Sequence, residues 1–304
     1  MKPTYEFDII ILGGGIAGMT AAIYAARANL KTVIIEKEVC GGLVNSTFQV
    51  ENFPSWISIN GMELMEKVLE QVEHLGVTVE QVAEFVKMEL KGDLKSVETE
   101  DGLYTGKVVI LSTGRQPIPL EIDTDLEQIH YCSICDGTAY KDKRVLVVGG
   151  GNSGFDEALY LLSLGIRDLT LIEVADRYFA SAAAQEMLAS KDRVTLLKST
   201  RIKTINGEGR LESVLLENVA TGMTEKLDVD GIFVFTGQKP NTEILQGIIE
   251  LDSDGYIPAT PDLSTSLPGV YAAGDVVRKA YLQITTAMSD GTIAALSSEK
   301  FLRR

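Results

Sequence analysis

A glycine-rich turn between a predicted strand and a predicted helix occurs twice in this chain, and it constrains the fold more than any other feature. In the first copy, the apolar residues 8–12 predict a buried strand, and a helical stretch follows to about Ala28. A second apolar run, residues 32–35, ends at Glu36. The turn has glycine at the three positions of the dinucleotide-binding fingerprint, which are Gly13, Gly15 and Gly18. Such a unit brings the backbone close to a pyrophosphate and offers the acid to a ribose hydroxyl.

The same arrangement returns in the second half of the chain. Residues 144–148 predict a strand, a glycine loop opens a helix, and residues 169–172 lead to Glu173. The fingerprint glycines of this copy are Gly149, Gly151 and Gly154. We therefore predict an internal duplication with two dinucleotide sites; the alternative, stronger for the second copy, is a unit that only packs and holds no nucleotide.

Two segments, residues 112–117 and 236–241, each follow a strand-like run and interrupt it with Gly and Pro. We interpret them as crossings between domains. The predicted domains are a discontinuous one, residues 1–115 and 245–304, and an inserted one, residues 116–244. The expected fold class is α/β, with two Rossmann-like, doubly wound dinucleotide-binding domains, the second inserted into the first.

Composition excludes several classes of protein. The 28 basic and 43 acidic residues give a formal charge of −15, which repels a phosphate backbone, so we expect no nucleic-acid partner. The first seven residues lack the pattern of a secretory signal, and glycines interrupt the apolar stretch of residues 9–26. We therefore expect a cytoplasmic protein that is neither exported nor inserted in a membrane.

Three cysteines are too few for a disulfide-stapled scaffold, and two of them, Cys132 and Cys135, form a close pair. Zinc needs about four ligands, and beyond this pair the chain offers only Cys40, His74 and His130 as soft or imidazole donors. We therefore predict no metal site and a redox role for the pair.

Asp136 directly follows the pair and is the candidate acid, because thiol–disulfide exchange needs a proton for the sulfur that leaves. The alternative for Asp136 is a carboxylate that only caps a helix. His130, two residues before Cys132, could lower the pKa of a thiolate, although a single histidine beside a motif more often packs or lies on the surface. Cys40 is expected to be a small buried residue.

Several motifs in a fixed order make the chain resemble the low-molecular-weight thioredoxin reductase family over nearly its whole length. They are the first glycine loop with Glu36, Gly41-Gly42, the segment 50–54, the segment 132–137, the second glycine loop, and the segment 271–275 with Gln283. The resemblance implies an FAD site formed by Gly13, Gly15, Gly18, Glu36, Gly42, Asn52, Gly274, Asp275 and Gln283. Asp275 would contact the flavin's sugar-like chain, and Asn52 and Gln283 would lie near the ring.

The resemblance also implies roles for the cysteines and a partner. Cys135 would face the flavin and Cys132 would attack the substrate disulfide, which belongs to thioredoxin or a thioredoxin-like protein. The family further implies a homodimer in which the inserted domain rotates between flavin and substrate. Relatives in peroxide systems have an additional N-terminal redox domain; this chain starts at the first strand, so we expect its substrate dithiol to belong to another protein.

One region departs from the NADPH-using members, which have a basic cluster after the second unit. Here a 2′-phosphate would meet Glu173 and Asp176, with only Arg177 to offset them, so NADPH is disfavoured. A free ribose 2′-hydroxyl would suit Glu173, which predicts NADH at the loop of Gly149, Gly151 and Gly154.

Two alternatives to an NADH-linked reductase remain open. Leu43 and Leu282 replace a glutamine and an arginine that are usual in NADPH-using members, which also fits a donor such as ferredoxin, flavodoxin or another dithiol. Some proteins of this fold are small-molecule dithiol oxidases, but those tend to have histidine after the second cysteine, where this chain has Asp136. A flavin-binding sensor without turnover is disfavoured by the intact cysteine pair beside an acid.

Overall fold

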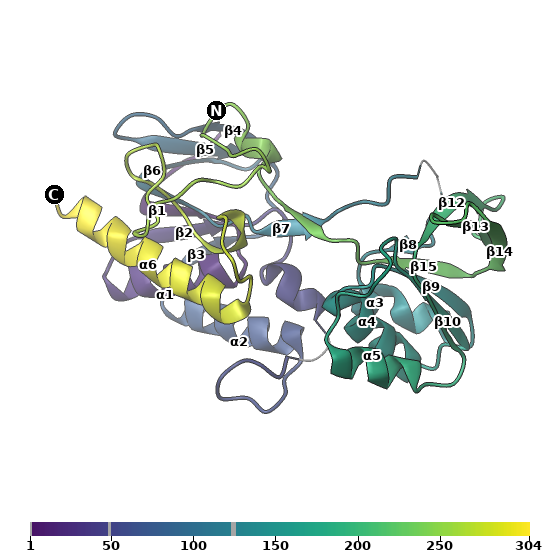
Figure 1. The fold of residues 1–304 in the computed structure, drawn as a ribbon. Coiled ribbons are helices and arrows are strands. Elements are labelled where there is room, and N and C mark those ends of the chain that lie inside the picture. Colours follow the sequence, from purple (N-terminus) through teal and green to yellow (C-terminus); the bar gives the residue numbers. More distant parts are fainter. Residues whose placement is uncertain (1, 48–49, 123–125) are drawn as a thin grey trace. The chain divides into compact units, whose positions relative to one another are not determined.

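The computed structural model describes residues 2–47, 50–122 and 126–304. The chain forms two compact units, unit 1 (Met1–Gln116 and Lys239–Arg304) and unit 2 (Pro117–Gln238), which Figure 1 shows with their elements labelled. Unit 1 resumes at Lys239, earlier than the residue 245 expected from the sequence. The reason is local: β16 (Gln238–Pro240) pairs with β7 (Arg115–Pro117), so the two crossing segments run side by side.

Unit 1 is built on a sheet of seven strands in the order β3-β2-β1-β6-β5-β4, with β17 beside β6. The central strand β1 pairs in parallel with β2 and β6, whereas β5 is antiparallel to β6. The strands are β1 (Thr4–Leu12), β2 (Thr32–Ile35), β3 (Thr78–Glu80), β4 (Phe85–Glu89), β5 (Lys95–Thr99), β6 (Leu103–Leu111) and β17 (Val270–Ala272). The helices are α1 (Ile16–Arg27), α2 (Gly61–His74) and α6 (Ile284–Leu302), with short 3-10 turns η1 (Gly42–Ser46), η3 (Glu243–Leu245) and η4 (Gly274–Val276).

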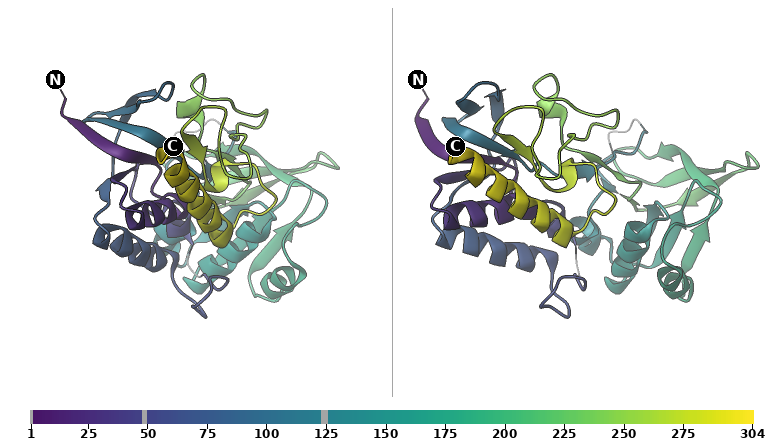
Figure 2. Two further views of the ribbon diagram at one scale, coloured as in Figure 1. Left: turned by 90° about the vertical axis from the view of Figure 1, so that its left-hand side faces the viewer. Right: turned by 60° about the vertical axis from the view of Figure 1, so that its left-hand side comes forward.

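The apolar run of β1 is buried on both faces, as the unbroken hydrophobic sequence predicts for a central parallel strand. Ile9 and Ile11 pack with the helices α1, α2 and α6, which lie side by side in Figures 1 and 2, and Ile10 and Leu12 pack on the opposite face. Helices α1 and α6 approach closely at Gly291, because a Cβ there would lie 2.2 Å from the carbonyl oxygen of Ala17. This contact ties the C-terminal helix to the helix that follows the first glycine loop.

Unit 2 contains a five-stranded parallel sheet in the order β11-β10-β9-β15-β8. Helices cover one face, and a three-stranded antiparallel sheet, β12-β13-β14, covers the other. The parallel strands are β8 (Ile129–His130), β9 (Arg144–Val148), β10 (Asp168–Ile172), β11 (Val194–Leu197) and β15 (Gly231–Val234), and the antiparallel ones are β12 (Thr200–Asn206), β13 (Ser213–Asn218) and β14 (Thr224–Asp228). The helices are α3 (Ser133–Asp136), η2 (Gly137–Tyr140), α4 (Asn152–Ser163) and α5 (Ala182–Ala189).

The predicted fold class is confirmed as α/β with two Rossmann-like dinucleotide-binding domains, the second inserted into the first. In unit 2, however, the second face of the parallel sheet is covered by the sheet β12-β13-β14 and not by helices. The strands expected at residues 32–35 and 144–148 coincide with β2 and β9. Over the part of the chain that the structure describes, no helix combines the length and the apolar character that crossing a membrane requires.

Candidate active site

The first glycine loop, in unit 1, has the backbone geometry that a pyrophosphate site needs. Gly13 has φ of 104°, which favours glycine, and a Cβ at Gly18 would lie only 2.0 Å from the carbonyl oxygen of Gly13. Gly15 is extended, and among the described residues no atom lies within 4 Å of a Cβ built there and no side chain caps α1. The first N–H groups of α1 therefore open onto space that a phosphate group can occupy.

Glu36 stands at the end of β2 and is fixed by two backbone groups. Its Oε2 accepts a hydrogen bond of 2.6 Å from the N–H of Gly14, and its Oε1 accepts one of 2.9 Å from the N–H of Glu38. Gly42, with φ of 58°, also lies at this loop, since a Cβ there would lie 3.6 Å from the Cα of Gly15. The structure thus brings the predicted loop, acid and second glycine motif together.

Asp275, in η4, has a buried carboxylate oxygen that fits a hydroxyl donor from a ligand. Its Oδ1 has no hydrogen-bond partner among the residues described, and Lys279 Nζ lies 3.7 Å from it. Burial raises the pKa of Asp275, and the cations of Lys279 and Arg115 oppose that shift. Asp290 accepts from the N–H of Gly274 at 3.0 Å and pairs with Lys279 at 2.6 Å. Sequence reasoning missed Lys279 and Asp290, which no motif marks.

Asn52 and Gln283, far apart in the sequence, meet in the structure. Asn52 Nδ2 donates to Gln283 Oε1 at 3.1 Å. Gln283 is also the N-cap of α6 and forms a capping box with Thr286. The helix start therefore fixes one of the two amides that the family resemblance places near a flavin ring. The open loop, the fixed Glu36 and the unsatisfied Asp275 oxygen together fit FAD.

The second glycine loop, in unit 2, repeats the geometry of the first. Gly149 has φ of 121°, and a Cβ at Gly154 would lie 1.9 Å from the carbonyl oxygen of Gly149. At Gly151, as at its counterpart in unit 1, the described chain places no atom within 4 Å of a Cβ and no side chain caps α4. The constraints that impose glycine at the first and third positions, and the open space at the second, are thus the same in both copies.

Glu173, like Glu36 in the first copy, is fixed by two backbone N–H groups. Its Oε2 accepts from the N–H of Gly150 at 2.7 Å, and its Oε1 accepts from the N–H of Ala175 at 2.9 Å. Arg177, the cation closest to it in sequence, has its guanidinium 5.1 Å from the ring centroid of Phe179. The carboxylate geometry of the first copy is therefore kept in the second.

Cys132 and Cys135 are joined by a disulfide at the start of α3. Cys132 is the N-cap of α3, and its Sγ accepts a hydrogen bond of 3.1 Å from the N–H of Cys135. The residue Cys135 is exposed. A thiolate at Cys132 would be stabilised by that N–H group. Cys40 differs: it is buried, and burial, followed by the charges of nearby carboxylates, raises its pKa to about 12, so its thiol is unreactive.

Asp136 closes α3 directly after the pair, and its side chain is 39% exposed. Its Oδ2 lies 3.2 Å from Nδ1 of His130, a contact that sequence reasoning did not predict.

A second carboxyl, Glu157 in α4, lies near Ser133 of the short cysteine helix, which α4 contacts. Glu157 Oε2 and the hydroxyl of Ser133 are both buried, and neither has a hydrogen-bond partner in the described structure. Burial raises the pKa of Glu157 to about 7, and the Ser133 hydroxyl partly opposes the shift.

The raised pKa of Glu157 predicts a pH-dependent stability. Folded protein holds this proton up to about pH 7 while unfolded chain releases it near 4.5, so stability falls as pH rises through that window. Glu157→Gln removes the burial of charge and should stabilise the protein by about 3 kcal/mol at pH 8, with little effect at pH 4.5. Urea unfolding at both pH values measures this, with the exposed Glu186→Gln as control. Equal stabilisation at both pH values would contradict it.

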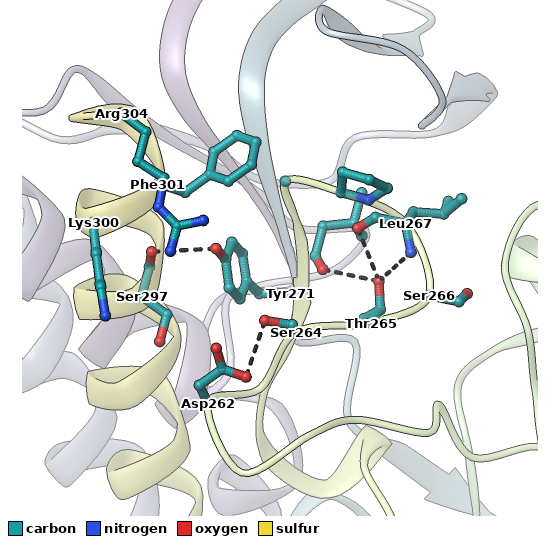
Figure 3. Close-up of a pocket in the computed structure, with 13 residues that line it drawn as sticks. Asp262, Ser264, Thr265, Ser266, Leu267, Tyr271, Ser297, Lys300, Phe301 and Arg304 are labelled. Carbon is teal, nitrogen blue, oxygen red and sulfur yellow. Dashed lines mark hydrogen bonds between the residues drawn. The ribbon is translucent and has the colours of Figure 1, made fainter.

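A separate cavity of about 280 Å³ lies in unit 1, where Figure 3 shows the residues that line it. Asp262, Lys300 and Arg304 bring charge to it, but no residue predicted for the cofactors or the disulfide lines it. Within residues 2–47, 50–122 and 126–304, no cluster of three His, Cys, Asp or Glu side chains is placed to hold a metal ion.

Comparison with known proteins extends these observations to the whole chain. The profile of the pyridine nucleotide-disulphide oxidoreductase family matches residues 7–291. A 34.2 kDa protein in the rubredoxin operon of Clostridium pasteurianum is 40% identical, with 99% of each chain covered. The thioredoxin reductase of Peptoclostridium acidaminophilum is 35% identical, with 97% of each chain covered. The solved thioredoxin reductase of Lactococcus lactis is 34% identical and matches with a TM-score of 0.91 over 98% of this chain and 99% of that one.

These matches span both units and both glycine loops. They include the segment with the cysteine pair, so the likeness extends beyond the nucleotide-binding architecture. The chain therefore belongs to the pyridine nucleotide-disulphide oxidoreductase family, as a flavoprotein disulfide oxidoreductase of the low-molecular-weight thioredoxin reductase type.

Proposed function

We propose that this protein passes two electrons from NADH, through FAD and the Cys132–Cys135 disulfide, to thioredoxin or a thioredoxin-like protein. The observation that carries the proposal is an accessible disulfide with Asp136 next to it, in the same unit as a second nucleotide loop. FAD, when bound, supplies the electrons that reduce the disulfide. The family also implies that the protein works as a homodimer.

The cysteines and Asp136 account for the exchange step. The Cys132 thiolate, stabilised by the N–H of Cys135, attacks the substrate disulfide and forms a mixed disulfide. The substrate sulfur that leaves takes a proton from Asp136. The Cys135 thiolate then attacks Cys132, which restores the Cys132–Cys135 disulfide and releases the second substrate sulfur. Two electrons leave the pair, and both substrate sulfurs end reduced.

NADH is supported by the second glycine loop. Glu173 has the same pair of backbone hydrogen bonds as Glu36, so it is held where a ribose hydroxyl can donate to it. A 2′-phosphate would instead meet this carboxylate, and the guanidinium of Arg177 lies over Phe179. NADPH is therefore disfavoured.

A donor other than a nicotinamide nucleotide is the second candidate. Leu43 and Leu282 stand where NADPH-using members usually have polar residues, which favours a changed donor site. The name of the Clostridium pasteurianum relative also places that protein in a rubredoxin operon. The donor would then be ferredoxin, flavodoxin or another dithiol.

The NADH proposal predicts a specific effect of Glu173. Wild-type protein should reduce thioredoxin with NADH at a kcat/KM at least about 100-fold above that with NADPH, because like charges meet at the ribose. Glu173→Ala should lower kcat/KM for NADH about 10-fold through loss of a charged hydrogen-bond acceptor. Asp192→Asn, at an exposed position of unit 2 outside the predicted ribose site, is the control and should leave the NADH value unchanged. If reduced ferredoxin supported turnover while NADH and NADPH did not, a donor other than a nicotinamide nucleotide would be favoured.

A further inference from the structure

His130 lies between two other polar side chains of unit 2. Its Nδ1 is 3.2 Å from Asp136 Oδ2, and its Nε2 is 2.6 Å from the hydroxyl of Tyr140. The His130 side chain is only 14% exposed, whereas that of Asp136 is 39% exposed. A largely buried imidazole thus joins a buried phenol to the carboxylate beside the cysteine pair.

The hydrogen-bond partners determine which nitrogen of His130 has the proton. Burial, together with Asp136 and Asp230, raises the pKa of Tyr140 to about 12, so its hydroxyl stays protonated and can donate to Nε2. Burial lowers the pKa of His130, against the opposing effect of Asp136, so the ring is neutral near pH 7. The single ring proton then belongs on Nδ1, which donates to Asp136 Oδ2.

Packing holds the imidazole in this position. His130 pairs with Phe233 in the parallel register of β8 and β15, and the two ring centroids are 5.0 Å apart. The Tyr140 ring lies edge-on to the rings of His130 and Phe233. It fits there because residue 231 is glycine, since a Cβ at that position would lie 2.3 Å from Cε1 of the Tyr140 ring. Lys143 Nζ lies 5.2 Å from the centroid of the Tyr140 ring. Residues of β8, β15, α3 and η2 therefore fix the position of the His130 imidazole.

We propose that His130 is a positioning residue, which Tyr140 orients and which in turn holds the Asp136 carboxyl beside the cysteine pair through Nδ1–H. The inference rests on the proposed function, in which Asp136 is the acid. Because Oδ2 is occupied by His130, Oδ1 is the oxygen that carries the proton to the leaving sulfur. After transfer, the Nδ1–H group stabilises the carboxylate. The role differs from direct action of His130 on a thiolate.

The first test is the tautomer, measured on the intact wild-type protein. The chain has only two histidines, so a ¹H–¹⁵N spectrum of the imidazoles is assigned with His74→Ala, at an exposed position in α2. We expect His130 to have its proton on Nδ1 and to remain mainly neutral at pH 6.5, because burial lowers its pKa. A proton on Nε2, or a charged ring at that pH, would overturn the proposal.

The second test is a double-mutant cycle on the rate at which dithionite-reduced protein reduces oxidised thioredoxin. Asp136→Asn should lower the rate about 100-fold, as loss of a general acid does. His130→Ala should lower it about 10-fold in the wild-type background and less than about twofold in Asp136→Asn, since a positioning residue acts only through its partner. His130→Asn, whose amide can replace Nδ1–H, should recover most of the rate, and His74→Ala should have no effect.

The outcomes separate the two proposals. Equal loss from His130→Ala in both backgrounds would overturn the positioning role and leave Asp136 as the acid. An unchanged rate in Asp136→Asn would overturn the role of Asp136 and the inference with it.

Discussion

Replacing Cys132 with serine is expected to slow the reduction of oxidised thioredoxin by dithionite-reduced protein at least about 1,000-fold, as loss of an enzyme nucleophile does. A serine hydroxyl neither attacks a disulfide at neutral pH nor forms one, so the electrons have no route out. Cys135→Ser should have an equally large effect, because Cys132 alone cannot return to the disulfide observed in the structure. Reduced thioredoxin is quantified by alkylation of its thiols in a single turnover, which does not depend on the natural electron donor.

Cys40 provides the matched control for these variants. It is buried and its pKa is raised to about 12, so Cys40→Ala should retain wild-type exchange. A Cys132→Ser protein with more than a tenth of the wild-type rate would show that the exchange does not pass through the pair. Loss of the rate in Cys40→Ala with the fold intact would assign a third cysteine to the reaction.

Replacing Gly15 with aspartate should abolish FAD binding without unfolding unit 1. The residue is extended, and the described structure leaves the space around its Cβ open, so an aspartate fits there and can cap α1. Its carboxylate would then occupy the anion site. A like charge about 4 Å away costs roughly 4 kcal/mol at a protein surface, so we expect FAD affinity to fall at least about 100-fold. Flavin absorbance of the purified protein, together with the unfolding temperature of the apoprotein, measures both effects.

Gly151→Asp is the counterpart in unit 2, where the same extended glycine precedes α4. This variant should bind FAD normally and lose reduction by NADH. If it lost FAD while Gly15→Asp kept it, the assignment of cofactors to the two loops would be reversed. If it kept full reduction by NADH, the second loop would not be the nucleotide site.

The backbone geometry of the glycine loops and the placing of their acids follow the sequence pattern, because these features depend on local sterics, while their binding of nucleotides stays a prediction. Gly13, Gly18, Gly149 and Gly154 are imposed by backbone conformation or by a neighbouring carbonyl within the same loop. Glu36 and Glu173 likewise bond to backbone N–H groups of the loop they accompany. A pattern of a few residues was therefore sufficient to predict them.

Contacts that depend on packing between distant segments could not be predicted in this way. His130 contacts Asp136 only because β8 pairs with β15 and because Gly231 makes room for the Tyr140 ring. Glu157 lies near Ser133 because α4 packs against the short cysteine helix, and both side-chain oxygens are buried there. No periodicity or motif in the sequence indicates either arrangement.

Anaerobic reduction of the bound flavin tests the central claim most directly. NADH, NADPH and dithiothreitol are added in turn to the purified protein, and flavin absorbance is followed. We expect rapid bleaching by NADH, little by NADPH, and bleaching by dithiothreitol through the cysteine pair in wild-type protein but not in Cys135→Ser. Bleaching of wild-type protein by dithiothreitol but by neither nucleotide would contradict entry of electrons at the second loop, and would leave that loop as a packing unit in a protein with a different donor.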